Sequence, residues 1–192
     1  MCEFCDNSIR TSGPDTNSQF REILEKCRAL FEKKLNDYGP SWRIFRPSSV
    51  TDQIFIKANR IRSIEIKGKS LIDDDILSEY IGIVNYGIIA LIQLEKGFSE
   101  SVDMTPKEAL REYDANSSEA LELMLNKNHD YDEAWRGMRI SSYIDIILVK
   151  LNRIKEIEKN NGQTTVSEGV GANYLDIVNY AVFALIKLVY EQ

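Results

Sequence analysis

Apolar residues recur at three- and four-residue spacing in six stretches of the chain, and this spacing places them on one face of an α-helix. The predicted helices span about 19–35, 49–66, 76–96, 106–128, 141–160 and 172–190. The third and the sixth are apolar on nearly every side, which is typical of helices at the centre of a bundle. No segment shows a convincing strand pattern. The pattern therefore predicts an all-α helical bundle.

Residues that favour helix termini stand near the predicted boundaries. Gly39 and Pro40 end the first helix, because both residue types break helical geometry. Ser48 or Ser49 can cap the second helix through a side-chain oxygen. Residues 105–108 read TPKE, which predicts a capping box with proline at the first helical position.

A long segment of the chain occurs twice. Residues 34–65 and 127–158 align without a gap at an offset of 93 and match at 16 of 32 positions. Unrelated segments would match at roughly 2, so the two are a duplication. After a gap of one residue, at an offset of 94, a second pair of segments aligns: YIGIVNYGIIALIQL at 80–94 and YLDIVNYAVFALIKL at 174–188.

The duplication predicts one compact domain made of two tandem three-helix repeats, over 19–97 and 98–192, after a flexible leader at 1–18. Each repeat is too small to bury its own apolar helix, so we expect the two to pack together about an internal pseudo-two-fold axis.

Composition narrows the classes of function. The net charge of −6 argues against a bulk nucleic-acid binder or an anionic-membrane binder, which would present a basic face. The most apolar run is interrupted by Asn85 and is shorter than the ~18 residues of a membrane span. Three cysteines make no disulfide framework, and the Cys2–Cys5 pair lacks further zinc ligands. With no apolar leader, we expect a cytoplasmic protein with reduced thiols.

Cations stand on helical faces that should be buried or half-buried. Lys57 and Lys150 lie three and four residues from apolar positions of their helices, and Arg60 and Arg153 follow one turn later. A buried cation is costly unless it is paired. Two interpretations remain open. One is an internal ion pair, with Asp52 and Asp145 or Glu65 and Glu158 as partners; the other is an anion pocket, in which lysine and arginine complement phosphate.

The connection after the first helix of each repeat keeps the same polar and aromatic residues. Residues in a loop are not kept in diverged copies by core packing, so their retention in both repeats indicates a function. Arginines and a tryptophan can grip phosphates and stack on a base. Alternatively, the aromatic residues close the end of the bundle while an arginine caps helix carbonyls. These candidates are Lys34, Asp37, Tyr38, Trp42, Arg43 and Arg46, with Lys127, Asp130, Tyr131, Trp135, Arg136 and Arg139 in the second repeat.

Polar residues also interrupt the two apolar helices. Asn85 and Asn179 need hydrogen-bond partners if buried, either on a facing helix or on a ligand base or sugar. Glu79 and Asp176 are the acids of a divided ExxD pattern, because Asn173 aligns with Glu79 and Gly82 with Asp176. Clustered carboxylates of this kind hold Mg²⁺.

The KxxDYxxxWRxxR, IKANRIRSIE/VKLNRIKEIE and IVNY segments resemble the bacterial nucleotide-modification-associated domain, type one. The resemblance covers about 20–190. That family is thought to be distantly related to the MazG-like all-α nucleoside-triphosphate pyrophosphohydrolases. Those enzymes bind (d)NTPs with Mg²⁺ and cleave between the α- and β-phosphates, with metal ligands from an ExxE and an ExxD motif. The resemblance thus implies a nucleotide or other small phosphate ligand.

Carried over residue by residue, the second metal motif falls on Glu79 and Asp176. The first falls where Lys57, Arg60, Lys150 and Arg153 stand, with only Glu65 and Glu158 nearby.

Three hypotheses follow. The chain is a Mg²⁺-dependent nucleotide pyrophosphohydrolase, in which the four carboxylates hold metal and Glu79 and Asp176 are catalytic. Alternatively, the chain is a non-catalytic nucleotide sensor in which lysine and arginine side chains bind the phosphate directly. Or it is a helical interaction scaffold. Homodimerisation is open in each case.

Overall fold

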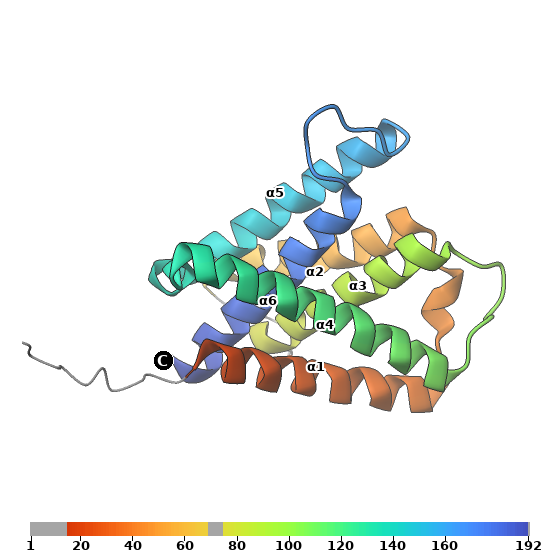
Figure 1. Cartoon of the computed structure of the whole chain (residues 1–192), viewed down its shortest axis with the longest axis horizontal. Coiled ribbons are helices and arrows are strands. Elements are labelled where there is room, and N and C mark those ends of the chain that lie inside the picture. The colour runs from red at the N-terminus through yellow and green to blue at the C-terminus, as the bar shows by residue number, and fades with distance from the viewer. Residues whose placement is uncertain (1–14, 69–74, 192) are drawn as a thin grey trace, which may run out of the picture.

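A computed structural model of the chain describes residues 15–68 and 75–191. Within these residues the protein consists of six α-helices and two 3-10 turns, with no strand, so the predicted all-α bundle is confirmed (Figure 1). Most of the predicted leader, including Cys2 and Cys5, lies in residues 1–14, which are outside the described residues. Residues 69–74 are also outside them. The elements are α1 (Thr16–Tyr38), η1 (Ser41–Ile44), α2 (Pro47–Lys67), α3 (Ile76–Lys96), α4 (Pro106–Tyr131), η2 (Ala134–Gly137), α5 (Ile140–Lys159) and α6 (Val170–Tyr190).

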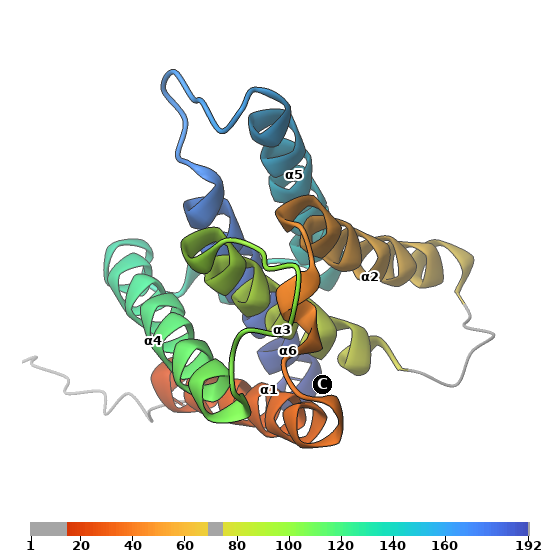
Figure 2. The same cartoon turned by 90° about the vertical axis from the view of Figure 1, so that its right-hand side faces the viewer.

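The helices pack in three layers. Helices α3 and α6 lie at the centre and contact each other most extensively. Helices α2 and α5 pack together on one side of them, and α1 and α4 pack together on the other (Figure 2). Each helix of the first repeat therefore contacts its counterpart in the second.

The central layer is the most apolar part of the chain. By length and composition α3 and α6 could each cross a membrane, with mean hydropathies of 1.4 and 1.3 over an 18-residue window. Within the bundle, 67% of each window is buried. Burial on nearly all sides is what a fully apolar helix needs, and here the neighbouring helices provide it.

Most predicted helix boundaries agree with the structure to within three residues. Helix α1 begins earlier than expected because Asp15 caps it, accepting hydrogen bonds from the backbone N–H groups of Asn17 (3.2 Å) and Ser18 (3.3 Å). The expected cap of α2 by a serine is wrong: Arg46 is its N-cap residue and makes no side-chain cap bond. Proline at the first helical position, with its fixed φ, starts this helix instead. The capping box of α4 is confirmed.

The connection after the first helix of each repeat is not an open polar loop. It contains a 3-10 turn whose tryptophan is buried: Trp42 in η1 and Trp135 in η2 are each 6% exposed. Trp42 lies beside Phe31, and Trp135 stacks on Phe183 with ring centroids 4.3 Å apart. The two turns close one end of each repeat and fix the aromatic residues that face the pockets described next.

Candidate functional site: two pockets in equivalent positions

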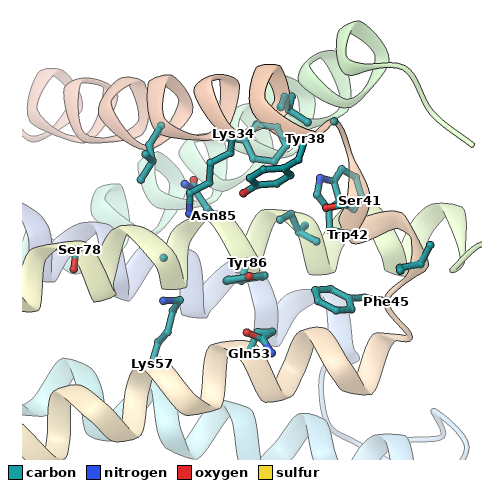
Figure 3. A pocket seen from close by; sticks show the side chains of 17 residues that line it. Lys34, Tyr38, Ser41, Trp42, Phe45, Gln53, Lys57, Ser78, Asn85 and Tyr86 are labelled. Atoms are coloured by element: carbon teal, nitrogen blue, oxygen red, sulfur yellow. The ribbon is translucent and has the colours of Figure 1, made fainter. Parts of the chain in front are cut away.

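The bundle contains two pockets of similar size. The first, of about 500 Å³, lies among α1, η1, α2 and α3, and the second, of about 550 Å³, lies among α4, η2, α5 and α6. Both volumes fall in the range of roughly 300–1,000 Å³ typical of small-molecule sites. Figure 3 shows the first pocket.

The two pockets are built from aligned positions of the two repeats. Apart from Glu168, every residue that lines the second pocket aligns with one that lines the first. The pairs that carry polar or aromatic groups are Lys34/Lys127, Tyr38/Tyr131, Trp42/Trp135, Phe45/Met138, Lys57/Lys150, Gly82/Asp176, Asn85/Asn179, Tyr86/Tyr180 and Ile89/Phe183.

Aromatic residues form one side of the first pocket. Tyr38, Trp42 and Tyr86 face it from α1, η1 and α3, and Phe45, the residue after η1, lies on the same side (Figure 3). The indole N–H of Trp42 is buried and has no hydrogen-bond partner among the described residues, and the same holds for Trp135 in the second pocket. A buried donor of this kind is costly to leave unpaired. Each pocket is therefore lined by a tryptophan whose buried indole N–H has no partner among the described residues.

Two side chains on the central helices hold the turns that carry these tryptophans. Gln93 Nε2 donates to the backbone carbonyl oxygens of Phe45 (2.6 Å), Arg43 (3.2 Å) and Trp42 (3.3 Å). At the aligned position of α6, Lys187 Nζ donates to the carbonyl oxygens of Arg136 (2.6 Å) and Met138 (2.9 Å). The carbonyl oxygens of Trp42 and Arg43 also accept from the backbone N–H groups of Phe45 (2.9 Å) and Ser99 (3.0 Å).

Cations form the opposite side of the first pocket. Lys34 and Lys57 reach toward α3 from α1 and α2 respectively (Figure 3). Lys57 Nζ lies 3.2 Å from the buried carboxylate of Glu79, which also accepts from Arg60. Lys34 has no hydrogen bond or ion pair with any residue in 15–68 or 75–191. The first pocket therefore carries an ammonium group that no described protein anion neutralises.

In the second pocket a carboxylate bridges the two lysines. Asp176 Oδ1 accepts from Lys127 Nζ, and its Oδ2 accepts from Lys150 Nζ, both at 2.5 Å. The aligned residue in the first pocket is Gly82, over which the Lys57 side chain lies: a Cβ there would meet Lys57 carbons at 2.6 and 2.7 Å. The expected lysine partners Asp52, Asp145, Glu65 and Glu158 are therefore wrong, because the ion pairs are made to acids on the neighbouring helix.

The two asparagines differ in their hydrogen bonds. Asn85 Nδ2 donates to the carbonyl oxygen of Cys27 (3.2 Å), and its Oδ1 accepts from the Tyr113 hydroxyl (2.7 Å). Burial raises the pKa of the Cys27 thiol to about 12, so this neighbour stays neutral. Asn179 is 4% exposed, and neither of its amide atoms has a partner within the described chain. The structural interpretation thus fits Asn85 and leaves Asn179 unexplained.

The turn arginines are held by protein groups away from the pockets. Arg43 is 2% exposed and donates to Asp103 through Nε (2.8 Å) and Nη2 (3.1 Å), and to the carbonyl oxygen of Gly97 (2.6 Å), which ends α3. Arg136 stacks over Trp135 at 4.4 Å and bonds Glu133 and Gln19. This is the alternative in which arginines cap helix carbonyls and brace the turns.

Other predicted site residues also stand outside both pockets. Asp37, Arg46, Asp130, Arg139 and Arg153 are exposed and line neither one, and Arg60 contacts Glu79 below the first. The predicted residues that the structure brings together are Lys34, Tyr38, Trp42, Lys57 and Asn85 in the first pocket, and Lys127, Tyr131, Trp135, Lys150, Asp176 and Asn179 in the second.

The four carboxylates expected to hold Mg²⁺ do not gather. Glu79 and Asp176 are each paired with two cations. Burial raises the pKa of Glu65 and of Glu158, and Glu158 accepts a hydrogen bond from Thr51 (3.2 Å). Across 15–68 and 75–191, no three His, Cys, Asp or Glu side chains are grouped to hold a metal ion. Carboxylates already neutralised by ammonium and guanidinium groups are poor Mg²⁺ ligands, so the donor set does not fit the metal.

Sequence reasoning missed several lining residues. Tyr86 and Tyr180 complete the pockets one residue after each asparagine, and Gln53 and Phe45 line the first. The tyrosines belong to the repeated IVNY segment, so their retention was a usable signal.

The comparisons with known proteins identify the family. The profile described as nucleotide modification associated domain 1 matches residues 34–94 and again residues 127–188. The chain belongs to this family. Searches of curated proteins and of solved structures found no match.

The two family segments coincide with the two pockets. Each match begins at the lysine of the first helix, Lys34 or Lys127, and continues through the third helix of its repeat. Except for Phe31, Leu30 and Met124, the lining residues of both pockets therefore lie within the segments that define nucleotide modification associated domain 1. The two matched segments therefore include most of the residues that line the cavities.

Proposed function

We propose that this protein binds a nucleotide in the first pocket, with the phosphate against Lys34 and Lys57 and the base against the aromatic side. The observation that carries the proposal is the unneutralised Lys34 ammonium beside Lys57, in a cavity whose other side is aromatic. The family's association with nucleotide modification supports the same ligand class.

The cationic side suits an anion. Lys57 and Arg60 share one carboxylate, that of Glu79, and Lys34 adds a further positive charge. The local balance is thus positive although the whole chain carries a net charge of −6. A phosphate oxygen accepts charge-assisted hydrogen bonds from ammonium groups, which are stronger than bonds between neutral groups.

The aromatic side suits a base. Trp42 is fixed by η1 and by Gln93, so it offers a rigid surface at little entropic cost. Tyr38 and Tyr86 stand between this surface and the lysines (Figure 3). A flat heterocycle stacked here would gain about 1–3 kcal/mol, the range measured for base–aromatic stacking.

Binding without catalysis is the version that the geometry supports best. Pyrophosphohydrolysis of the MazG type needs carboxylates free to hold Mg²⁺, and Glu79 and Asp176 are occupied by lysine and arginine. We therefore place the protein among nucleotide-binding modules that sense or deliver nucleotides, with hydrolysis as the alternative that the experiment below also measures.

The test is calorimetric titration of the protein with deoxynucleoside mono- and triphosphates, with and without Mg²⁺. Lys34→Met should weaken binding by roughly ten- to hundredfold, because a charge-assisted bond contributes about 1.5–3 kcal/mol. Lys33→Met, an exposed neighbour on α1 that does not line the pocket, is the control and should bind as the parent does. No binding of any nucleotide, or equal affinities in the two variants, would refute the proposal. Metal-dependent release of pyrophosphate would instead establish the enzyme.

A further inference from the structure

The second pocket differs from the first at the position where an anion would bind. Where the first pocket has Gly82, the second has Asp176, whose carboxylate accepts from both Lys127 and Lys150. The carboxylate is 5% exposed and remains against the lysines. The protein's own carboxylate thus already binds the two lysines that a ligand phosphate would otherwise meet in the second pocket.

The charges lining the two pockets differ accordingly. Among lining residues the first pocket has two lysines and no acid, whereas the second has two lysines together with Asp176 and Glu168. The formal charge at neutral pH is +2 in the first and zero in the second. A phosphate entering the second pocket would meet a carboxylate already bound to the cations, and like charges at this distance repel.

We propose that the second pocket is a separate site for an uncharged ring with an amide edge, of the class of a nucleobase or a nucleoside without phosphate. The two repeats thereby bind different ligands. The difference between Gly82 and Asp176 determines which pocket accepts a ligand that carries phosphate. This second site is independent of nucleotide binding in the first pocket.

Asn179 provides the polar recognition. Its counterpart Asn85 is satisfied by the hydroxyl of Tyr113 on α4. The residue of α1 that aligns with Tyr113 is Phe20, which has no hydroxyl, and Asn179 keeps both its donor and its acceptor unpaired while lining the second pocket. A ring with adjacent N–H and C=O groups can pair with both amide atoms at once.

Aromatic surface completes the site. Trp135 and Phe183 stack on each other, and Tyr180 meets Phe183 edge to face with centroids 6.3 Å apart. The indole N–H of Trp135 is a second unpaired buried donor in this pocket. The site therefore combines aromatic surface with two buried donors and one buried acceptor that lack partners among the described residues, and Asp176 already occupies its two lysines.

The two tryptophans allow each pocket to be followed separately. The chain has two tryptophans, Trp42 in the first pocket and Trp135 in the second. A Trp42→Phe protein reports the second pocket through Trp135 fluorescence, and a Trp135→Phe protein reports the first through Trp42. Failure of nucleotide binding in the first pocket is then distinct from failure of this inference.

The experiment titrates the Trp42→Phe protein with thymidine and with thymidine monophosphate. We expect saturable quenching by thymidine and at least tenfold weaker quenching by the monophosphate. Adding Asn179→Leu should abolish the thymidine response, with circular dichroism confirming that the protein is folded. Adding Asp176→Gly, which copies the first pocket, should reverse the preference in favour of the monophosphate.

Two results would overturn the inference. One is the absence of a thymidine response in the Trp42→Phe protein, or a response that Asn179→Leu leaves unchanged. The other is an unchanged preference after Asp176→Gly. If Asn179→Leu unfolds, the Asp176→Gly reversal decides alone, because a gain of monophosphate binding cannot come from unfolding.

Discussion

Gln93 on α3 and Lys187 on α6 occupy aligned positions, and each binds backbone carbonyls of the 3-10 turn that carries a pocket tryptophan. One is a neutral amide and the other an ammonium, yet the acceptors are equivalent. The two repeats thus make the same contact with different side chains, and we infer that it holds the turn in place. This relationship gives the first prediction.

Gln93→Leu should loosen η1 and partly expose Trp42. The two N–H groups of its amide lie within hydrogen-bond distance of three carbonyl oxygens, and two of these contacts are buried, so we expect a loss of about 2–3 kcal/mol in unfolding free energy. In a Trp135→Phe background the Trp42 emission should shift to the red. Lys187→Met in a Trp42→Phe background should likewise shift the Trp135 emission to the red. Unshifted emission in both proteins would contradict the inference that Gln93 and Lys187 hold the two turns.

Arg43 is predicted to stabilise the fold rather than to bind ligand. Arg43→Lys removes the bidentate contact with Asp103 and the bond to Gly97, so urea unfolding should show a loss of about 2–4 kcal/mol. Arg46→Lys, an exposed change in the same connection, should cost less than about 0.5 kcal/mol. Nucleotide affinity should be unchanged in folded Arg43→Lys protein; a selective loss of affinity with full stability would restore Arg43 as a ligand residue.

Glu158 should make the stability of the protein depend on pH. Burial raises the pKa of its carboxyl in the folded state, with the Thr51 hydrogen bond opposing the shift. A raised folded-state pKa means that this group's stabilising contribution is full below its unfolded pKa of about 4.3 and is lost as pH rises through the folded value.

Replacing the Glu158 carboxylate by an uncharged isostere should therefore stabilise the folded protein at neutral pH. We expect Glu158→Gln to melt at a higher temperature than the parent at pH 7, with the difference shrinking toward pH 4. Glu156→Gln, on the exposed face of α5, is the control. A lower melting temperature at pH 7 that Mg²⁺ accentuates would point instead to the metal-ligand role.

The Tyr113 hydroxyl should matter to the first pocket although it comes from the second repeat. Tyr113→Phe copies the arrangement around Asn179 and removes a 2.7 Å bond to Asn85 Oδ1. Leaving a buried acceptor unpaired should lower the unfolding free energy by about 1–3 kcal/mol, measured by chemical denaturation. Tyr86→Phe changes a hydroxyl on a half-buried ring in the same pocket and is the matched control. Equal stability of the two variants would contradict the assigned role.

The fold followed closely from local patterns. Helical spacing predicted the six helices, and Gly39 and the capping box at Thr105 predicted the end of α1 and the start of α4, because these are properties of neighbouring residues. The serine cap of α2 was wrong because Pro47 starts that helix two or three residues before the position that a cap at Ser48 or Ser49 would set. The alignment of the repeats also predicted which residues would recur around equivalent sites.

Contacts between helices could not be predicted in the same way. Spacing placed Lys57 and Lys150 on inner faces, but their partners Glu79 and Asp176 come from adjacent helices whose rotation and offset the sequence does not encode locally. The same limit applies to Arg43, whose carboxylate partner lies 60 residues away in the chain. Arg153, expected to follow Lys150 inward, is exposed.

The contacts that each first helix makes with the other repeat bear on how such a chain arose. Helix α4 supplies Tyr113 to the amide of the first pocket, and α1 supplies Gln19 to Arg136, which braces the turn of the second. A lone ancestral repeat would have lacked these groups unless it met another copy, so its folding would have varied with protein concentration. Joining two copies in one polypeptide made that encounter intramolecular, and it also freed each copy to lose or gain a carboxylate without altering the other.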